Sequence, residues 1–168
     1  MTTLIAFLRA VNVGGTGKLP MAELRAMAER CGFADARTYI ASGNLVFRTD
    51  TTADGARVAL EAELAAWAGK PVPVFLRTPA ELDDILAANP FPDAPGNRCL
   101  VTFLDAPPPE GWQSEIRHLK DEEIAAIGRE IYIHYGDGMG QSRLVIPAAR
   151  SGTARNLNTI RKLVEMVG

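Results

Sequence analysis

The chain begins with an apolar run over residues 3–8 that ends at Arg9. Residues 3–10 therefore predict a strand that is covered on both faces and lies at the centre of a sheet. The spacing of apolar and turn residues then predicts the following elements: a helix beginning at Pro20, a hairpin of strands 37–41 and 44–49, an amphipathic helix over 53–69 and a strand over 72–77. This β-α-β-β-α-β order is that of the ferredoxin-like fold.

The apolar pattern starts again in the second half of the chain. Residues 100–106 (LVTFLDA) repeat residues 4–10 (LIAFLRA), with Leu, Phe, Leu and Ala at the same offsets. The apolar residues that follow predict a helix through Trp112, Ile116 and Leu119, strands over 122–127 and 130–135, a loop over 136–142 and a helix from about residue 156 to 167. In this second unit the last helix takes the place of a fourth strand.

These patterns predict an α/β (α+β) protein of two tandem ferredoxin-like β-α-β-β-α units packed together, with an extra C-terminal helix. The first unit is expected over residues 1–78 and the second over 98–168. Residues 79–97 are expected to form a connecting helix and loop, since Asn89-Pro90 disfavours helix at that point.

Composition narrows the class of protein. The chain is 47% hydrophobic and 23% charged, which is typical of a globular protein. Its 18 Lys and Arg against 20 Asp and Glu give a net charge of −2, so the basic face that duplex nucleic acid requires is not expected. The N-terminal apolar run is too short to cross a membrane and lacks a basic start, so we expect a cytoplasmic protein without membrane partners.

The first candidate site is the segment 9–18 (RAVNVGGTGK). Backbone N–H groups around Gly14 and Gly15 could converge on an anion, with charge from Arg9 and Lys18. The segment is not a complete phosphate-binding loop, because Asn12 stands where that motif has its first glycine. A flexible connection explains the glycines equally well, and an ion pair with a carboxylate would explain Arg9.

Two further polar segments are candidates. Ser42-Gly43-Asn44 could contact a phosphate or a base, although a hairpin turn needs the same residue types. Arg155 and Asn156, before the last helix, suit an anion at a helix N-terminus, although Asn is also a common helix cap.

Groups that would indicate catalysis or a metal are missing from the sequence. His118 and His134 have no evident nucleophile or orienting partner. Asp137 is a single carboxylate in a glycine-rich loop, and the two cysteines form no C-x-x-C pair, so no metal site is expected. The sequence assigns no cofactor and leaves open whether the protein is an enzyme.

Several of these positions carry a resemblance to a known family. The segments concerned are residues 8–15 (LRAVNVGG), 18–24 (KLPMAEL), 38–47 (TYIASGNLVF), Asn89-Pro90-Phe91, Ser142 and 153–159 (TARNLNT). Together they resemble the uncharacterised bacterial family known as domain of unknown function 1697. The resemblance implies a tandem ferredoxin-like fold and no established activity. Leu157 stands where the pattern usually has tryptophan, and Arg143 where it usually has lysine.

Three functions compete on this evidence. The first is binding, with or without catalysis, of a small anionic or phosphate-bearing ligand by the glycine-rich and Arg/Asn segments. The second is single-stranded nucleic acid bound across an exposed sheet face, which requires several exposed aromatic residues on that face. The third is a protein-interaction module or homodimer without chemistry, which requires a large apolar surface patch.

Overall fold

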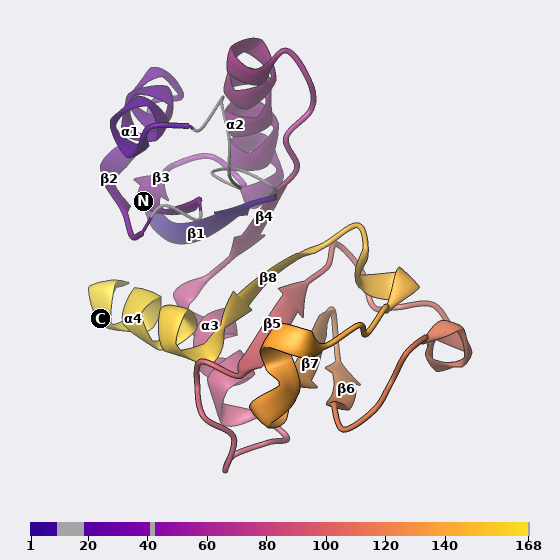
Figure 1. Cartoon of the computed structure of the whole chain (residues 1–168). Helices are drawn as coiled ribbons and strands as arrows, with labels where there is room; N and C mark the ends of the chain where they lie inside the picture. The colour runs from indigo at the N-terminus through magenta and orange to yellow at the C-terminus, as the bar shows by residue number, and fades with distance from the viewer. Residues whose placement is uncertain (10–18, 41–42, 168) are drawn as a thin grey trace. The chain divides into compact units, whose positions relative to one another are not determined.

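The computed structural model describes residues 1–9, 19–40 and 43–167 (Figure 1). The chain divides into two compact units, Met1–Glu81 with Glu165–Gly168, and Leu82–Val164. The division falls within the helix α3 (Pro79–Ala87), where the sequence predicts a connecting helix. The structure is a mixed α/β fold with two four-stranded antiparallel sheets, one in each unit.

The first unit follows the predicted order of elements. They are β1 (Thr2–Leu8), α1 (Met21–Arg30), β2 (Ala34–Thr38), β3 (Asn44–Thr49), α2 (Ala53–Ala68) and β4 (Val74–Arg77). The strand order is β2-β3-β1-β4, and β1 pairs antiparallel with both β3 and β4. The prediction of a central, doubly covered first strand is therefore confirmed, and residues 4–8 are all buried.

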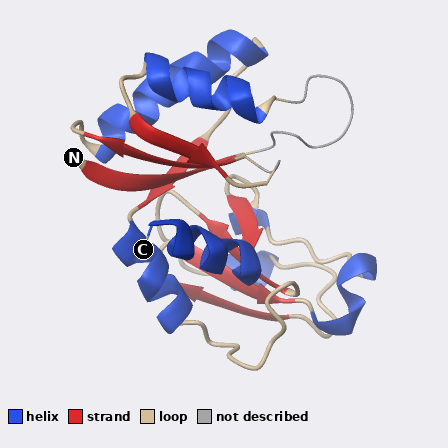
Figure 2. Cartoon of the chain, turned by 90° about the vertical axis from the view of Figure 1, so that its left-hand side faces the viewer, coloured by secondary structure: helices blue, strands red, loops and turns tan. Residues whose placement is uncertain are grey.

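The core of the first unit lies between its sheet and its two helices, which sit on the same side of that sheet (Figure 2). Alternate β1 residues Leu4, Ala6 and Leu8 join a cluster with apolar residues of α1 and α2. Thr52 accepts a hydrogen bond from the Gly55 amide and so caps α2. The buried residues of α2 are Ala56, Leu60 and Leu64, whereas Trp67 near its end is 38% exposed.

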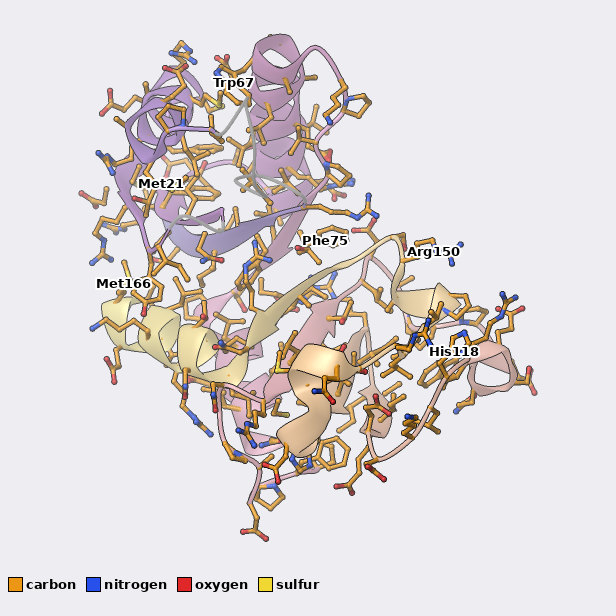
Figure 3. All side chains as sticks on the ribbon, in the orientation of Figure 1. Met21, Trp67, Phe75, His118, Arg150 and Met166 are labelled. Carbon is orange, nitrogen blue, oxygen red and sulfur yellow. The ribbon has the colours of Figure 1, made fainter. Side chains whose placement is uncertain are left out.

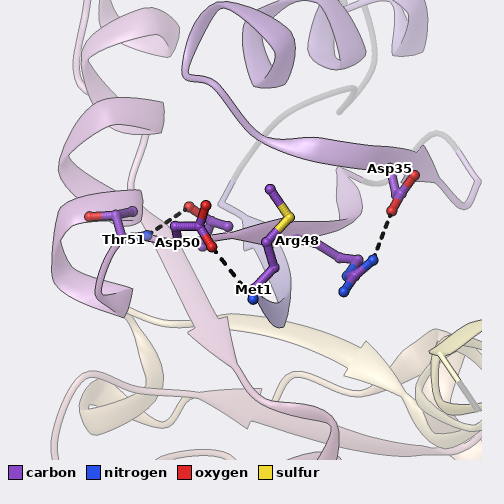
Figure 4. Close-up of polar contacts among 6 residues, drawn as sticks. Met1, Asp35, Arg48, Asp50 and Thr51 are labelled. Atoms are coloured by element: carbon purple, nitrogen blue, oxygen red, sulfur yellow. Dashed lines mark hydrogen bonds and ion pairs between the residues drawn. The ribbon is translucent and has the colours of Figure 1, made fainter.

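Short polar contacts hold the far end of the β1–β3 pair (Figure 4). The Met1 ammonium lies 3.5 Å from Asp50, and the Thr51 amide donates to Thr49 Oγ1 at 3.2 Å. Arg48 pairs with Asp35 of β2 at 3.4 Å. These exposed charge pairs contribute little stability, since water competes for both partners.

The second unit contains the rest of the elements. They are most of α3, β5 (Cys99–Phe103), β6 (Glu123–Ile127), β7 (Glu130–His134), β8 (Thr153–Asn156), most of α4 (Leu157–Val167) and short 3₁₀ helices at Trp112–Glu115, Gly136–Gln141 and Pro147–Ala149. The strand order β6-β7-β5-β8 matches that of the first sheet, and the repeated segment β5 is central just as β1 is. The structure therefore confirms that the internal repeat marks two sheets of the same order.

The helix predicted through Trp112, Ile116 and Leu119 is wrong. Only a single 3₁₀ turn forms at Trp112–Glu115, after Gly111 in the left-handed conformation (φ 81°). Arg117 then exchanges two backbone hydrogen bonds with Val145, at 2.9 and 3.0 Å. Pairing with a distant segment overrides the local helical spacing. The loop predicted over 136–142 is likewise mostly a 3₁₀ helix.

The second unit has a fourth strand, contrary to the prediction that the last helix replaces it. β8 is only four residues long, and its sequence TARN lacks the alternation that identifies a strand. Its pairing with β5 defines it instead. Just before it, a side chain at Gly152 would place Cβ 2.4 Å from the Phe103 carbonyl oxygen, so only glycine allows this close approach.

Irregular segments close one hydrophobic cluster of the second unit. Leu104, Ile131 and Ile133 pack with Trp112 and Ile146, which come from the segments around β6–β8 that form no α-helix. Tyr132 is buried in this unit and donates its hydroxyl to the Ile85 carbonyl at 2.7 Å. Burial raises the pKa of Tyr132 above its ordinary value, so the phenol stays neutral. Among the described residues, no helix is long and apolar enough to cross a membrane.

Candidate functional site

The described residues of two of the three candidate segments, Arg9 and Gly43-Asn44, lie at the C-terminal end of β1. The Leu8 amide donates to the Gly43 carbonyl at 2.9 Å, and the Arg9 amide donates to the Pro73 carbonyl at 3.0 Å. Arg9 therefore follows a buried strand, between the β2–β3 hairpin and the start of β4, and it is half-buried. We call the described residues Arg9, Tyr39, Ile40, Gly43 and Asn44 the β1-end site.

Asn44 holds the hairpin of this site together. Its side-chain amide donates to the Tyr39 carbonyl at 3.0 Å, and the Tyr39 amide donates to the Asn44 carbonyl at 3.2 Å. Asn44 is fully buried opposite Phe7 of β1. Its amide thus has a positioning role in the hairpin, with the side chain turned to the backbone.

The hairpin carries backbone strain at its exposed end. Gly43 has φ 81°, which costs glycine nothing, but Ile40 has φ 49° and is 50% exposed. A β-branched residue in the left-handed region is a rare outlier that costs on the order of 1–3 kcal/mol. Such strain persists only where surrounding contacts hold it, and it concentrates at ligand-binding segments.

Five of the predicted ligand-binding residues lie outside the described residues. They are Asn12, Gly14, Gly15, Lys18 and Ser42. Their part in binding stays a prediction from the sequence.

The third candidate segment belongs to the second unit and is a strand followed by a helix. Arg155 of β8 is only 7% exposed, and its guanidinium donates to Thr153 Oγ1 at 2.8 Å and to the Ala154 carbonyl at 2.9 Å. Burial lowers the pKa of Arg155 to about 10. Asn156 Oδ1 accepts from the Thr159 amide at 2.8 Å, which is the geometry of a helix cap for α4.

A second buried arginine, missed from the sequence, occupies the matching place in the first unit. Arg77 of β4 pairs with Ile5, and Arg155 of β8 pairs with Val101, which is the residue that matches Ile5 in the repeat. Arg77 is 2% exposed and donates to the carbonyl of the residue before it, Leu76, at 2.8 Å. The sequence repeat of β1 and β5 was the signal that could have pointed to Arg77. The strand pairing is needed to see that β4 and β8 also correspond.

Comparison with known proteins identifies a family for this chain. The model of the family described as "Protein of unknown function (DUF1697)" matches residues 1–132. The chain belongs to the DUF1697 family. A solved structure, that of conserved bacterial protein SP0830 from Streptococcus pneumoniae, is 22% identical over 99% of both chains, with a TM-score of 0.78. At that identity the likeness establishes the fold. No curated protein matches the chain.

The extent of the DUF1697 match separates the candidate segments. The matched residues include the whole β1-end site, and they end at Tyr132 within β7. Arg155 and Asn156 lie beyond the match. The match thus covers one of the two described groups of candidate residues, and the family's description names no activity.

The described part of this DUF1697 chain holds no cluster of three or more His, Cys, Asp or Glu side chains able to bind a metal ion. Asp137, the single carboxylate of the glycine-rich loop, forms an ion pair with Arg98. The β1-end site therefore combines an arginine at the end of a buried strand with a strained hairpin, and an arginine side chain suits recognition of an anion.

Proposed function

We propose that this DUF1697 protein binds a small anionic, phosphate-bearing ligand at the β1-end site. The observation that carries the proposal is the hydrogen bond from the Leu8 amide to the Gly43 carbonyl, which fixes the hairpin beside Arg9. A guanidinium on a buried strand end presents several donors in a fixed plane, the geometry that matches phosphate oxygens. The strained hairpin supports a ligand-contacting role for the same edge of the sheet.

The second function, single-stranded nucleic acid binding, has weaker support. Base stacking needs exposed aromatic rings on the sheet. The aromatic side chains of the described strands are all buried; they are Phe7, Phe47, Phe75, Phe103 and Tyr132. A stacking platform on these strands would require a large rearrangement.

An interaction module or homodimer without chemistry also has weaker support. Exposed large apolar residues are scattered over the described part of the chain, at Met1, Ile40, Val58, Trp67, Leu119 and Ile127. Single exposed apolar residues are normal on protein surfaces, whereas an interface requires a continuous patch.

The proposal is tested by thermal unfolding of the wild-type protein and the Arg9→Ala variant. Each is measured with phosphate, sulfate, mononucleotides, coenzymes and a short single-stranded oligonucleotide. A ligand at about 100 times its Kd stabilises the folded state by roughly 2.7 kcal/mol. We expect a rise in the unfolding midpoint with a phosphate-bearing ligand, and its loss in Arg9→Ala.

Arg48→Ala is the matched control, because Arg48 lies at the opposite end of the β1–β3 pair, opposite Thr3. It removes the same charge from the same unit, so the ligand-induced shift should remain. An equal loss of the shift in Arg48→Ala would show that the ligand responds to the net charge of the protein and not to a site at Arg9. No shift with any phosphate-bearing ligand in well-folded wild-type protein would refute the proposal.

A further inference from the structure

The second unit contains a cavity that the β1-end site does not involve. Its volume is about 410 Å³, and it lies between the segment 118–122, which leads into β6, and the segment 135–143 after β7. Pockets for small molecules usually measure roughly 300–1,000 Å³. The cavity therefore has room for a compact metabolite.

Fixed backbone geometry shapes one wall of this cavity. Arg117 is tied to Val145 by two backbone hydrogen bonds, and His118 next to it has φ 58°. His118 lies on the loop before β6 (Figure 3). A non-glycine residue in the left-handed region turns the chain sharply. The turn leads the next four residues along the cavity, and three of them are charged: Lys120, Asp121 and Glu122.

The carboxylate of Glu122 is held in the cavity by two hydrogen bonds. One carboxylate oxygen accepts from the Lys120 amide at 2.7 Å, and the other accepts from the Ser142 hydroxyl. The Ser142 hydrogen bond, with that of the Lys120 amide, lowers the pKa of Glu122, so the carboxylate is ionised at neutral pH. Each oxygen still has lone pairs for a ligand donor. Because Ser142 also accepts from the Leu144 amide at 3.3 Å, the carboxylate is held from both walls.

An aromatic ring stands close to this carboxylate. Tyr135 lines the same cavity, and its pKa is raised by burial and by the charge of Glu122. A neutral ring beside a fixed carboxylate is a favourable place for a cation, which gains from the ion pair and from the ring face.

The charged side chains around the cavity, Glu122 included, balance. Two basic and two acidic side chains line it: Lys120, Arg143, Asp121 and Glu122. A purely cationic ligand would be repelled by the basic pair, and a purely anionic one by the acidic pair. A ligand with both charges satisfies the two sets together.

We propose that this cavity binds a small zwitterion of the amino-acid class, with its ammonium group on Glu122 beside Tyr135 and its carboxylate toward Lys120 and Arg143. The inference is independent of the anion site, because it uses other residues in the other unit. The two proposed sites differ in the charge that they bind most firmly. The β1-end site binds an anionic group, and this cavity binds an ammonium group.

The test is a titration of the ¹⁵N-labelled full chain followed by amide chemical shifts. The probes are the free amino acids, with L-phenylalanine compared with phenethylamine, which lacks the carboxylate, and 3-phenylpropanoate, which lacks the amine. We expect saturable shifts in residues 118–122 and 135–143 with an amino acid. Phenethylamine should bind more weakly than phenylalanine, and 3-phenylpropanoate most weakly of the three.

Two matched variants localise the binding. Glu122→Gln keeps the shape and removes the charge, and we expect affinity to fall about tenfold or more. Glu123→Gln changes the next residue, which is exposed and pairs with His134, and affinity should stay within twofold. The amide spectrum of each variant reports its fold in the same experiment.

Three results would overturn the proposal. They are the absence of saturable shifts with every amino acid, equal affinity in Glu122→Gln and wild type, and binding of 3-phenylpropanoate as tight as that of phenylalanine. The Arg9→Ala variant should bind the amino acid as wild type does, so failure here is separate from failure of the anion site.

Discussion

The two units share a strand order but differ in what covers the sheet face that carries Leu8 in the first and Leu104 in the second. In the first unit, Leu8 of β1 packs in a core closed by α1 and α2. In the second, the matching residue Leu104 packs in a core closed by 3₁₀ turns and loops, through Trp112 and Ile146. The order of a sheet is thus preserved by its central strand and register, while the cover depends on local sequence. In the first unit, regular helices pack closely against the sheet. In the second unit, irregular segments leave room for the polar cavity at Glu122.

The sharpest way to test this comparison is to remove one core side chain from each unit. Leu60→Ala, in α2, should cost about 4 kcal/mol, since Leu60 is fully buried between rigid elements. Ile146→Ala should cost nearer 2 kcal/mol, because Ile146 is 8% exposed and its neighbours are loops that can collapse into the space. Urea unfolding with comparison of m-values measures both.

Val58→Ala serves as the control for these truncations, because Val58 lies on α2 but is 62% exposed. Its effect should stay within about 0.5 kcal/mol. Equal losses for Leu60→Ala and Ile146→Ala would show that the irregular cover is as rigid as the helical one.

The paired arginines test how far the two units correspond. Arg77→Ala and Arg155→Ala each remove a buried guanidinium that bonds the preceding carbonyl, so each should cost about 2–3 kcal/mol. The two losses should agree within about 1 kcal/mol in urea unfolding. Arg48→Ala, at an exposed pair, should cost at most about 0.5 kcal/mol. A large loss of stability at one buried arginine, with none at the other, would show that the two arginines do not have equivalent roles.

Helix caps give the smallest expected effect. Thr52→Ala in the first unit and Asn156→Ala in the second each remove a side-chain acceptor at a helix start, at a cost of about 1 kcal/mol. Asn156→Asp keeps the acceptor and should restore thermal stability. If Asn156→Ala leaves the unfolding midpoint unchanged, capping does not explain this residue, and its predicted ligand contact becomes the better account.

Much of the fold followed from apolar spacing. The first strand and the long helices were predicted because their burial is continuous or periodic, and the repeat at 100–106 identified the second central strand. The failures share a cause, since the segments at 112–119 and 153–156 take their structure from distant pairing with Val145 and β5. The local sequence of a segment does not show which distant segment it will pair with.

The candidate residues divide in the same way. Arg9 and the Gly43 hairpin stood out as polar residues at strand ends, and their proximity follows from the predicted order of strands. Glu122 gave no signal and Ser142 stood out only through the family resemblance, because the two residues are far apart in the chain and meet only through two irregular loops. Arg77 reads as an ordinary strand-end residue until its pairing with Ile5 reveals its counterpart.

The buried arginines have a further consequence, which concerns aggregation. β4 and β8 are edge strands, and an exposed edge invites pairing with a strand of another molecule. Because the Arg9 amide bonds the Pro73 carbonyl, alternation along β4 points the Leu76 carbonyl outward, and Ala154 holds the matching place on β8. Each of these carbonyls already accepts a guanidinium N–H. One arginine in each sheet therefore occupies a carbonyl that the edge strand would otherwise offer to a strand of another molecule.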